Sequence, residues 1–245
     1  MRFRPLILGA VGLTALGLCG CTNAPGRPGP GEMPVVPSEI SDFSTLYEQN
    51  CSGCHGPEGK GGAAIALADP VYLAIADDAI LRHAATNGIT GTSMPAFAQS
   101  AGGMLTSKQI EVIVSGIRER WSMPNIFGGA DPPPYSSSTP GVSARGSEVY
   151  ATYCSSCHGA GGRGGQKASS IVEGSFLALV SDQGLRTIVI AGRPELGAPD
   201  WRGNIPGSPM SAQDVSDVVA WLASQRPTFP GQPFPATAKL TGDLR

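Results

Sequence analysis

Two twelve-residue stretches of the chain have the same residue at eight of their twelve positions. Residues 51–62 have the sequence CSGCHGPEGKGG, and residues 154–165 have the sequence CSSCHGAGGRGG. The similarity extends well beyond these stretches, because the alignment of the two copies drifts by only two residues up to the end of each. A repeat that occurs only twice indicates two small folds in tandem rather than a solenoid, which needs three or more units.

Each copy predicts three helices, so the chain is expected to be mainly α-helical. The first helix precedes the cysteine pair, over 39–50 and 143–153, and the second covers 77–87 and 182–191. The third has apolar residues at i, i+3, i+4 and i+7, which is the stripe of an amphipathic helix. It also opens with a capping box, in which two polar side chains bond the exposed backbone of the first turn. The capping pairs are Thr106 with Gln109 and Ser211 with Asp214.

The sizes of four aligned residues predict how the first and last helices cross. Phe43 aligns with Gly146, whereas Gly116 aligns with Trp221. One copy thus has its large residue on the first helix and the other copy has it on the last, as close packing at a crossing permits. We expect Phe43 to lie over Gly116 and Trp221 to lie over Gly146; a chance correspondence is the alternative.

Stretches rich in proline and glycine separate the two copies from each other and from both ends of the chain. Such stretches do not form a packed core and act as spacers. The expected segments are a leader (1–20), a tether (21–38), the first repeat (39–122), a linker (123–141), the second repeat (142–226) and a tail (227–245).

The leader has the features of an export signal. Arg2 and Arg4 precede an apolar run over 6–18, which is shorter than the about 20 residues that a membrane-spanning helix needs. The run ends in LCGC, which resembles the cleavage box of bacterial lipoproteins. Cys21 is therefore the expected lipidated first residue, and Cys19 is lost with the leader. The alternative is an ordinary exported protein with an unmodified Cys21. We expect the chain to be lipid-anchored at the periplasmic or outer face of a bacterial membrane.

The overall charge excludes one class of partner. The formal net charge is −2, and no cluster of Lys and Arg stands out. Nucleic-acid binding depends on such clusters, so it is not expected.

The pentapeptide C-x-x-C-H inside each repeat indicates covalent attachment of a c-type haem. The two thiols form thioether bonds, and the histidine is the proximal iron ligand. A zinc site would need a fourth Cys or His ligand in each copy, and after removal of the leader no unused cysteine remains for it. A disulfide between the two cysteines would leave the histidine at the same place in both copies unexplained. A thioredoxin-like motif would lie in a βαβ pattern, which the sequence lacks. We therefore expect two covalently attached haem c groups with their iron. The attachment residues are Cys51, Cys54 and His55 in the first repeat and Cys154, Cys157 and His158 in the second.

With these motifs, both repeats resemble class I cytochrome c domains, and the whole chain resembles bacterial dihaem cytochromes c. The resemblance covers nearly all of residues 39–226 and rests on the CxxCH after a first helix, the loop that follows and the closing helix. It implies two tandem helical domains, each wrapped around one haem. An apolar cofactor would then supply part of the core that so small a domain lacks.

The resemblance also implies a methionine as the sixth iron ligand, in the loop before the last helix. In the first repeat this is Met94, followed by proline; His83 and Met104 are the rivals. In the second repeat the alignment puts Ala198 at that place, and alanine cannot bind iron. Met210 is the candidate there, and an open or water-bound iron is the alternative.

Two arginines at matching positions are candidate contacts of the haem propionates. These are Arg82 and Arg186, and an exposed arginine on a helix is an equally good interpretation of each.

The expected function is that of a membrane-anchored electron carrier rather than an enzyme. It would pass single electrons between respiratory or photosynthetic partners, such as a quinol-oxidising complex and a terminal oxidase. The alternative is a peroxidase or sulfur-compound oxidoreductase in which the second haem has an open position and the first relays electrons. A fixed subunit of a respiratory complex is a third interpretation.

Overall fold

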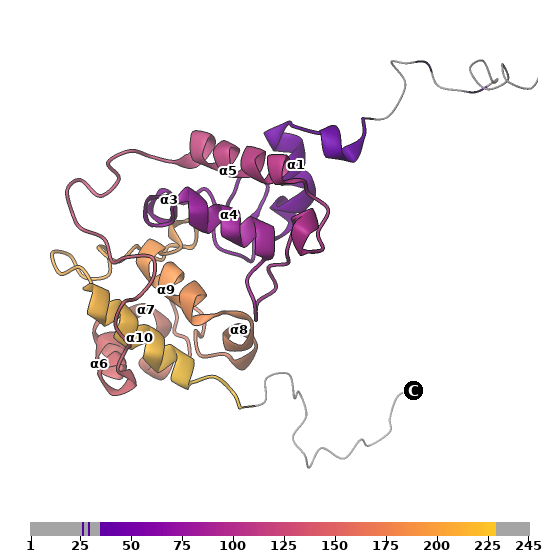
Figure 1. The fold of residues 1–245 in the computed structure, drawn as a ribbon. Coiled ribbons are helices and arrows are strands. Elements are labelled where there is room, and N and C mark those ends of the chain that lie inside the picture. Colours follow the sequence, from indigo (N-terminus) through magenta and orange to yellow (C-terminus); the bar gives the residue numbers. More distant parts are fainter. Residues whose placement is uncertain (1–25, 27–28, 30–34, 229–245) are drawn as a thin grey trace, which may run out of the picture. The chain divides into compact units, whose positions relative to one another are not determined.

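The computed structural model describes residues 26, 29 and 35–228 (Figure 1). It divides into Met1–Glu39 and Ile40–Arg245, and the first of these contains one short 3₁₀-helix, η1 (Pro37–Glu39). The leader, Cys21 and the tail from residue 229 lie outside the described residues, and the interpretations made of them remain predictions. None of the helices in the described part is both long enough and apolar enough to cross a membrane.

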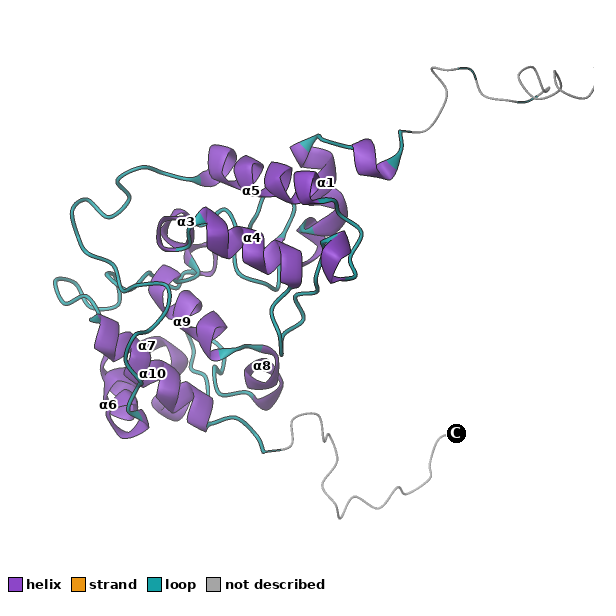
Figure 2. Ribbon diagram, in the orientation of Figure 1, coloured by secondary structure: helices purple, strands orange, loops and turns teal. Residues whose placement is uncertain are grey.

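The described residues fold into helices and loops without a strand, which confirms a mainly α-helical fold (Figure 2). The first repeat contains α1 (Phe43–Asn50), α2 (Ser52–His55), α3 (Pro70–Ile75), α4 (Asp78–Asn87), η2 (Gln99–Ala101) and α5 (Ser107–Trp121). The second contains α6 (Ser143–Tyr153), α7 (Ser155–His158), η3 (Ala160–Gly162), α8 (Gly174–Leu179), α9 (Asp182–Ala191), η4 (Pro194–Leu196) and α10 (Ala212–Ser224). The α-helices follow one another in the same order in both repeats.

The sequence predicted most helix limits and missed the shortest helices. Both capping boxes are present, and α6 and α9 have the predicted bounds. The first helix was predicted to begin at Glu39, but α1 begins at Phe43 because the Asp42 side chain caps it, accepting from the Thr45 backbone N–H at 2.8 Å. The helices α3 and α8 were not predicted, since six residues are too few to show a helical period.

The predicted crossing of the first and last helices is confirmed in both repeats. A Cβ atom added to Gly116 would lie 2.0 Å from Cδ2 of Phe43. A Cβ atom added to Gly146 would lie 2.8 Å from Cβ of Trp221 and closer still to the carbonyl oxygen of Asp217. Only glycine therefore permits α1 to pack on α5 and α6 to pack on α10 at these distances.

A tryptophan packs on the tyrosine of the first helix in each repeat, but from different places on the last helix. Trp121 meets Tyr47 edge to face at a centroid distance of 5.2 Å, and Trp221 stacks on Tyr150 at 4.4 Å. Each indole also lies against the glycine-rich turn that follows the CxxCH motif. The two tryptophans are not aligned in the sequence, so only the packing reveals that they have the same role.

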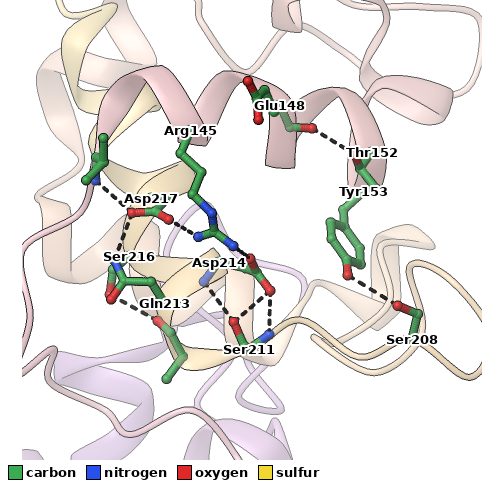
Figure 3. Close-up of polar contacts among 12 residues, drawn as sticks. Arg145, Glu148, Thr152, Tyr153, Ser208, Ser211, Gln213, Asp214, Ser216 and Asp217 are labelled. Carbon is green, nitrogen blue, oxygen red and sulfur yellow. Dashed lines mark hydrogen bonds and ion pairs between the residues drawn. The ribbon is translucent and has the colours of Figure 1, made fainter.

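A buried carboxylate joins α6 to α10 (Figure 3). Asp217 accepts from the backbone N–H of Val142 at 2.7 Å and from Nε2 of Gln213 at 2.9 Å, and it pairs with Arg145. Arg145 also reaches Asp214, at 2.6 Å. Burial alone would raise the pKa of Asp217, but the hydrogen bonds and the charge of Arg145 outweigh it and lower the pKa below its usual value.

The two repeats contact each other within Ile40–Arg245. Helix α3 packs against α9, and the side chain of Arg193 donates to the carbonyl oxygen of Gly62 at 3.1 Å. Arg202 donates to the carbonyl oxygen of Ile126 in the linker at 3.0 Å. Two arginines from the segment after α9 thus bind the loop that follows the first CxxCH motif and the linker.

Candidate functional site

The first CxxCH motif lies on the break between α1 and α2. Cys51 ends α1 and begins α2, and His55 is the last residue of α2. The His55 backbone N–H donates to the Cys51 carbonyl at 3.0 Å, so the motif makes one helical turn. Residues three and four apart lie on one face of such a turn, which brings Cys51, Cys54 and His55 to the same side.

The glycines after the motif fold the chain back onto it. Gly56 has a φ of 84°, which reverses the chain directly after the histidine, and its carbonyl accepts from the Tyr47 hydroxyl at 2.8 Å. A Cβ atom on Gly62 would lie 2.1 Å from the carbonyl oxygen of Cys54. The glycine-rich run therefore serves close packing around the motif.

His55 has one ring nitrogen bonded and the other without a partner. Nδ1 lies 2.7 Å from the carbonyl oxygen of Ile65, and since a carbonyl only accepts, Nδ1 carries the proton. Nε2 is buried and has no hydrogen-bond partner. Burial also lowers the pKa of His55, which favours the neutral ring. A neutral imidazole with its Nδ1–H bonded to a backbone carbonyl and a free Nε2 lone pair is the usual form of a metal-binding histidine.

The second motif repeats this arrangement with a more exposed histidine. Nδ1 of His158 lies 2.9 Å from the carbonyl oxygen of Ser169, and the Tyr150 hydroxyl donates to the carbonyl of Gly159 at 2.6 Å. His158 is half-buried, whereas His55 is buried. The hydrogen bond that orients the ring is therefore the same, but the shielding from water is weaker.

The environment of the first cysteine in each motif disfavours thiolate chemistry. None of the four cysteines of the motifs forms a disulfide bond, and burial, with a smaller effect of the second cysteine, raises the pKa of the Cys51 thiol to about 12 and that of the Cys154 thiol to about 11. A redox thiol or a zinc ligand needs a lowered pKa. A thioether carries no charge, so burial does not oppose it. Among residues 26, 29 and 35–228, no three His, Cys, Asp or Glu side chains are grouped to hold a metal ion.

The loops that follow α4 and α9 place Ala198 where the first repeat has Met94. The Ile89 backbone N–H donates to the Met94 carbonyl at 3.0 Å, and the Arg193 N–H donates to the Ala198 carbonyl at 2.9 Å. Met94 is half-buried. The sequence alignment of Met94 with Ala198 is thus confirmed by the backbone.

Met210 occupies the place of an apolar packing residue of the first repeat. Its backbone N–H donates to the Trp201 carbonyl at 3.0 Å, as that of Leu105 donates to the Phe97 carbonyl at 2.7 Å. The Met210 side chain is fully buried, and its sulfur lies 3.9 Å from Nδ2 of Asn204. The structure therefore gives Met210 a packing role, and its role as an iron ligand stays a prediction.

The two arginines expected near the propionates have partners within the protein. Arg82 forms a bidentate pair with Glu111, with one distance of 2.8 Å, and both side chains are exposed. Arg186 is buried and donates to the linker carbonyls of Pro134, at 2.9 Å, and Tyr135, at 3.1 Å. These contacts do not support the propionate assignment; Arg186 instead binds the linker.

Sequence analysis does not single out Trp201, a residue of the second repeat that is notable in the structure. Its indole Nε1–H is buried and has no hydrogen-bond partner. The first repeat has Phe97 at this place, so the one signal in the sequence was the exchange of a phenyl ring for an indole.

The residues of both repeats fit a bound haem. Among the described residues, the buried side-chain polar atoms without a partner are His55 Nε2 and Trp201 Nε1, one in each repeat. Buried polar groups are nearly always bonded in native proteins, so an unpaired one indicates a missing partner. Haem offers both kinds of partner, iron for an imidazole lone pair and carboxylates for an N–H.

Comparison with known proteins identifies the family. The model of the family described as cytochrome C oxidase, cbb3-type, subunit III, matches residues 38–115 and again 142–222, each match enclosing one CxxCH motif. The chain is also similar to the Cbb3-type cytochrome c oxidase subunit FixP of Sinorhizobium medicae (strain WSM419), with 26% identity over 139 residues. That match spans 52% of this chain and 42% of the relative.

Two solved structures show more distant likeness. A reducing HAO-like protein complex of Kuenenia stuttgartiensis matches with a TM-score of 0.42 and 17% identity, covering 79% of this chain and 100% of the other. Thiosulfate dehydrogenase from Marichromatium purpuratum matches with a TM-score of 0.28 and 18% identity, covering 83% of this chain and 50% of the other.

The two family matches together span more than half of the chain. Covalently bound haem c with its iron is the cofactor that this family implies, and the unpaired histidine nitrogen fits it. This protein therefore belongs to the cytochrome c family described as cytochrome C oxidase, cbb3-type, subunit III.

Proposed function

We propose that the protein is a membrane-anchored dihaem cytochrome c that transfers single electrons between redox partners. In this proposal each repeat holds one haem through the two cysteines and the histidine of its motif, and Cys21 carries the lipid. The iron ligands are His55 and Met94 in the first repeat and His158 and Met210 in the second.

The observation that carries the proposal is the hydrogen-bonding state of His55. Its proton is held on Nδ1 by the Ile65 carbonyl, so the buried Nε2 keeps a lone pair that no group of the described residues uses. The group bonded to Nδ1 is a backbone carbonyl, not the carboxylate that orients the histidine of a Ser-His-Asp triad. The arrangement suits a fixed metal ligand rather than a general base.

The residues of the chain would position and tune the cofactor rather than perform bond chemistry. Haem iron, when bound, supplies a one-electron change between ferric and ferrous states. The Nδ1–H bonds of His55 and His158 to backbone carbonyls keep both rings in one tautomer and orientation. The tyrosine-to-glycine bonds after each motif hold the turn that carries the histidine. A rigid site of this kind limits the reorganisation that accompanies a change of charge.

The family and its relative support a terminal oxidase as one redox partner. The family description and the relative's name both refer to a cbb3-type cytochrome c oxidase. The other partner in this proposal is a quinol-oxidising complex. A lipid on Cys21 would hold the protein at the membrane surface where such complexes are embedded.

Counting haems by the pyridine haemochrome method tests the proposal. The exported protein should carry two haems per chain, and Cys51→Ser with Cys54→Ser should leave one. Cys154→Ser with Cys157→Ser should leave the other. Ser52→Ala, inside the first motif, is the matched control and should keep both. One haem per chain in the unsubstituted protein would refute the dihaem proposal.

A second candidate function rests on Ala198. Since its backbone occupies the place of Met94, the second repeat lacks a methionine where the first has one. If Met210 only packs, the second iron has an open position, and the protein would act on a small substrate there, with the first haem as its relay. A peroxidase or a sulfur-compound oxidoreductase is the class of enzyme that this would suit.

Carbon monoxide binding to the dithionite-reduced protein separates the two functions. An open ferrous haem binds the gas at once, and a methionine-ligated one resists. No reaction at either haem supports pure electron transfer, and Met210→Ala should then open the second haem. Immediate reaction of the haem retained in the Cys51→Ser, Cys54→Ser variant favours the enzyme.

A further inference from the structure

Two arginines at aligned positions have different partners in the two repeats. Arg82 of α4 forms an ion pair with Glu111 of α5. The alignment places Arg186 of α9 at the position of Arg82, and Ser216 of α10 at the position of Glu111. Nη1 of Arg186 donates to the Ser216 hydroxyl at 3.1 Å. The second repeat thus keeps the contact between these two helices but lacks the carboxylate.

Arg186 is therefore a buried cation with neutral partners. It is 3% exposed, whereas the side chain of Arg82 is 42% exposed. Within the described part of the chain, Arg186 bonds one hydroxyl and the backbone carbonyls of Pro134 and Tyr135, and it pairs with no carboxylate. A buried charge needs partners that replace its lost hydration. With a serine in place of an acid, the rigid fork of the guanidinium is free to take these partners from the linker.

The linker segment 134–137, here called the strap, is bound by both α9 and α10. Besides the bonds from Arg186, Nε2 of Gln183 on α9 donates to the Tyr135 carbonyl at 2.8 Å. The hydroxyls of Ser137 and Ser216 lie 2.8 Å apart. Ser216 therefore contacts both Arg186 and the strap, at the position where the first repeat has its acid.

The strap also reaches the first repeat. The Tyr135 ring is half-buried and packs against the core. Tyr135 is close enough to Tyr72 of α3 to contribute to the raised pKa of that phenol, of which burial is the larger cause. Helix α3 in turn packs against α9. The backbone of Tyr135 is thus held by the second repeat, while its side chain lies beside the helix of the first repeat that α9 contacts.

We propose that Arg186 positions the second repeat against the first by binding the strap, and thereby sets the separation of the two haem sites. This inference rests on the proposed electron transfer through two haems. The rate of electron transfer falls steeply with the separation of the two groups, so a fixed separation keeps transfer between the sites rapid. The chain then acts as a relay of two linked sites rather than as two independent carriers.

The direct test measures how firmly the two repeats are fixed in the full-length haem-loaded protein. Gadolinium spin labels on Lys108→Cys and Glu148→Cys, both exposed positions, report the distance between α5 and α6 by pulsed dipolar EPR. The protein is reduced and treated with carbon monoxide so that both irons are diamagnetic. We expect a narrow distance distribution in this labelled chain and a broad one after Arg186→Met, which keeps a long side chain and removes its donors. A distribution that is broad already before this substitution, or still narrow after it, would overturn the inference.

Arg82→Met is the matched control. It removes the aligned arginine of the first repeat, whose bonds in the described part of the chain stay within that repeat. The distance distribution should remain narrow in this variant. Equal broadening in Arg82→Met and Arg186→Met would contradict a specific role of Arg186.

Ser216→Glu tests the missing acid without a change at Arg186. The new carboxylate makes the second repeat like the first and should draw Arg186 into an ion pair, which releases the strap and broadens the distribution. Ser216→Gln has the same size without the charge and should keep the distribution narrow. Equal distributions in the two variants would refute the role given to the missing acid. This pair also decides the question where Arg186→Met does not fold.

Pulse radiolysis tests the consequence for electron transfer. It delivers single electrons to the oxidised protein, and the visible spectrum then follows their redistribution between the haems. Redistribution should be slower in Arg186→Met than in the unsubstituted protein and unchanged in Arg82→Met. An unchanged rate in Arg186→Met would contradict the role of the strap in electron transfer.

These outcomes are distinct from failure of the proposed function. A haem count of one per chain would refute the dihaem proposal, whereas the distance between the spin labels does not depend on the iron. Two haems per chain together with a distribution that Arg186→Met leaves narrow would refute the inference about the strap alone.

Discussion

His55 and His158 have the same hydrogen bond and different burial, and this difference has electronic consequences at the scale of single residues. His55 is 7% exposed, whereas His158 is half-buried. A drier surrounding disfavours the extra positive charge of ferric iron and raises the reduction potential. We expect two one-electron steps in a redox titration, with the first repeat responsible for the higher one.

Met94→Ala should affect only the higher of these steps. Loss of the proposed sulfur ligand opens the first iron, so the potential should fall and the reduced haem should bind carbon monoxide. Visible spectra during a redox titration and after addition of the gas measure both effects. Met104→Ala is the control, because Met104 is 84% exposed and should leave the spectrum unchanged. An unaltered first haem in Met94→Ala would remove Met94 from the proposed ligand set.

Asp217→Asn should show how a single buried carboxylate couples stability to pH. The pKa of Asp217 in the folded protein is lowered below the ordinary 3.8. The charged carboxylate therefore makes its full contribution to the free energy of unfolding above pH 3.8, and this contribution is lost as the pH falls through the pKa of the folded state. Asparagine keeps the shape and loses the charge, which should cost about 2 kcal/mol of unfolding free energy at pH 7. The cost should shrink below about pH 4. Denaturant unfolding at pH 7 and pH 3 measures the difference.

Glu148→Gln serves as the control for this prediction. Glu148 is an exposed carboxylate on the same helix, α6, and forms no ion pair among the described residues (Figure 3). Its substitution should not alter the dependence of stability on pH. A pH-independent cost of Asp217→Asn would mean that hydrogen bonding, and not charge, dominates at this site.

At the scale of elements, each repeat is organised by the crossing of its first and last helices. The crossing brings the tyrosine of the first helix under a tryptophan of the last one and onto the turn after the CxxCH motif. The tyrosine that packs in the helix crossing thus also bonds the turn directly after the histidine. The helix pair is thus part of the haem site as well as of the core.

Gly116→Ala should disrupt this crossing in the first repeat. The new Cβ would lie 2.0 Å from the Phe43 ring, so the helices must separate, at a cost of about 1–3 kcal/mol in unfolding free energy. Phe43→Ala in the same chain should recover part of this cost by making room. Ser115→Ala, at an exposed neighbouring position of α5, is the control and should be nearly neutral. Additive costs in the double variant, measured by denaturant unfolding, would argue against the crossing.

At the scale of the whole molecule, arginines hold segments that belong to different parts of the chain. Arg186 binds the linker carbonyls, Arg202 binds the linker at Ile126, and Arg193 reaches Gly62 of the first repeat. An arginine presents several donors in a rigid fork, which suits it to groups of backbone carbonyls. These contacts order the linker against the second repeat, although its composition alone predicts a loose spacer.

Cys21→Ser should release the protein from the membrane. Each buried CH₂ of an acyl chain contributes about 0.8 kcal/mol to membrane binding, and the substitution removes the site of acylation. Cell fractionation followed by haem staining measures the location. Cys19→Ser is the control, since that residue is expected to leave with the signal peptide. Continued membrane binding of Cys21→Ser would show that the anchor lies elsewhere.

Several parts of this architecture were predictable from short-range patterns. The capping boxes of α5 and α10 and the bounds of α6 and α9 follow from local hydrogen bonding and helical periodicity. The packing of Phe43 on Gly116 was predictable because the second repeat has a small residue, Gly146, in place of Phe43 and a large one, Trp221, in place of Gly116. Haem attachment was predictable because the spacing of the two cysteines and the histidine in CxxCH is typical of it.

The sequence by itself determined the helical class, the duplication and the two haem motifs, because these depend on residue types at fixed short separations. The tertiary structure alone decided that Trp121 and Trp221 each pack on the tyrosine of the first helix of their repeat and that Arg186 binds the linker. It alone also showed that the buried indole N–H of Trp201 has no partner among the described residues. Such facts depend on which distant groups come within hydrogen-bonding or contact distance after folding. That proximity is set by the packing of the whole repeat, which no local pattern records.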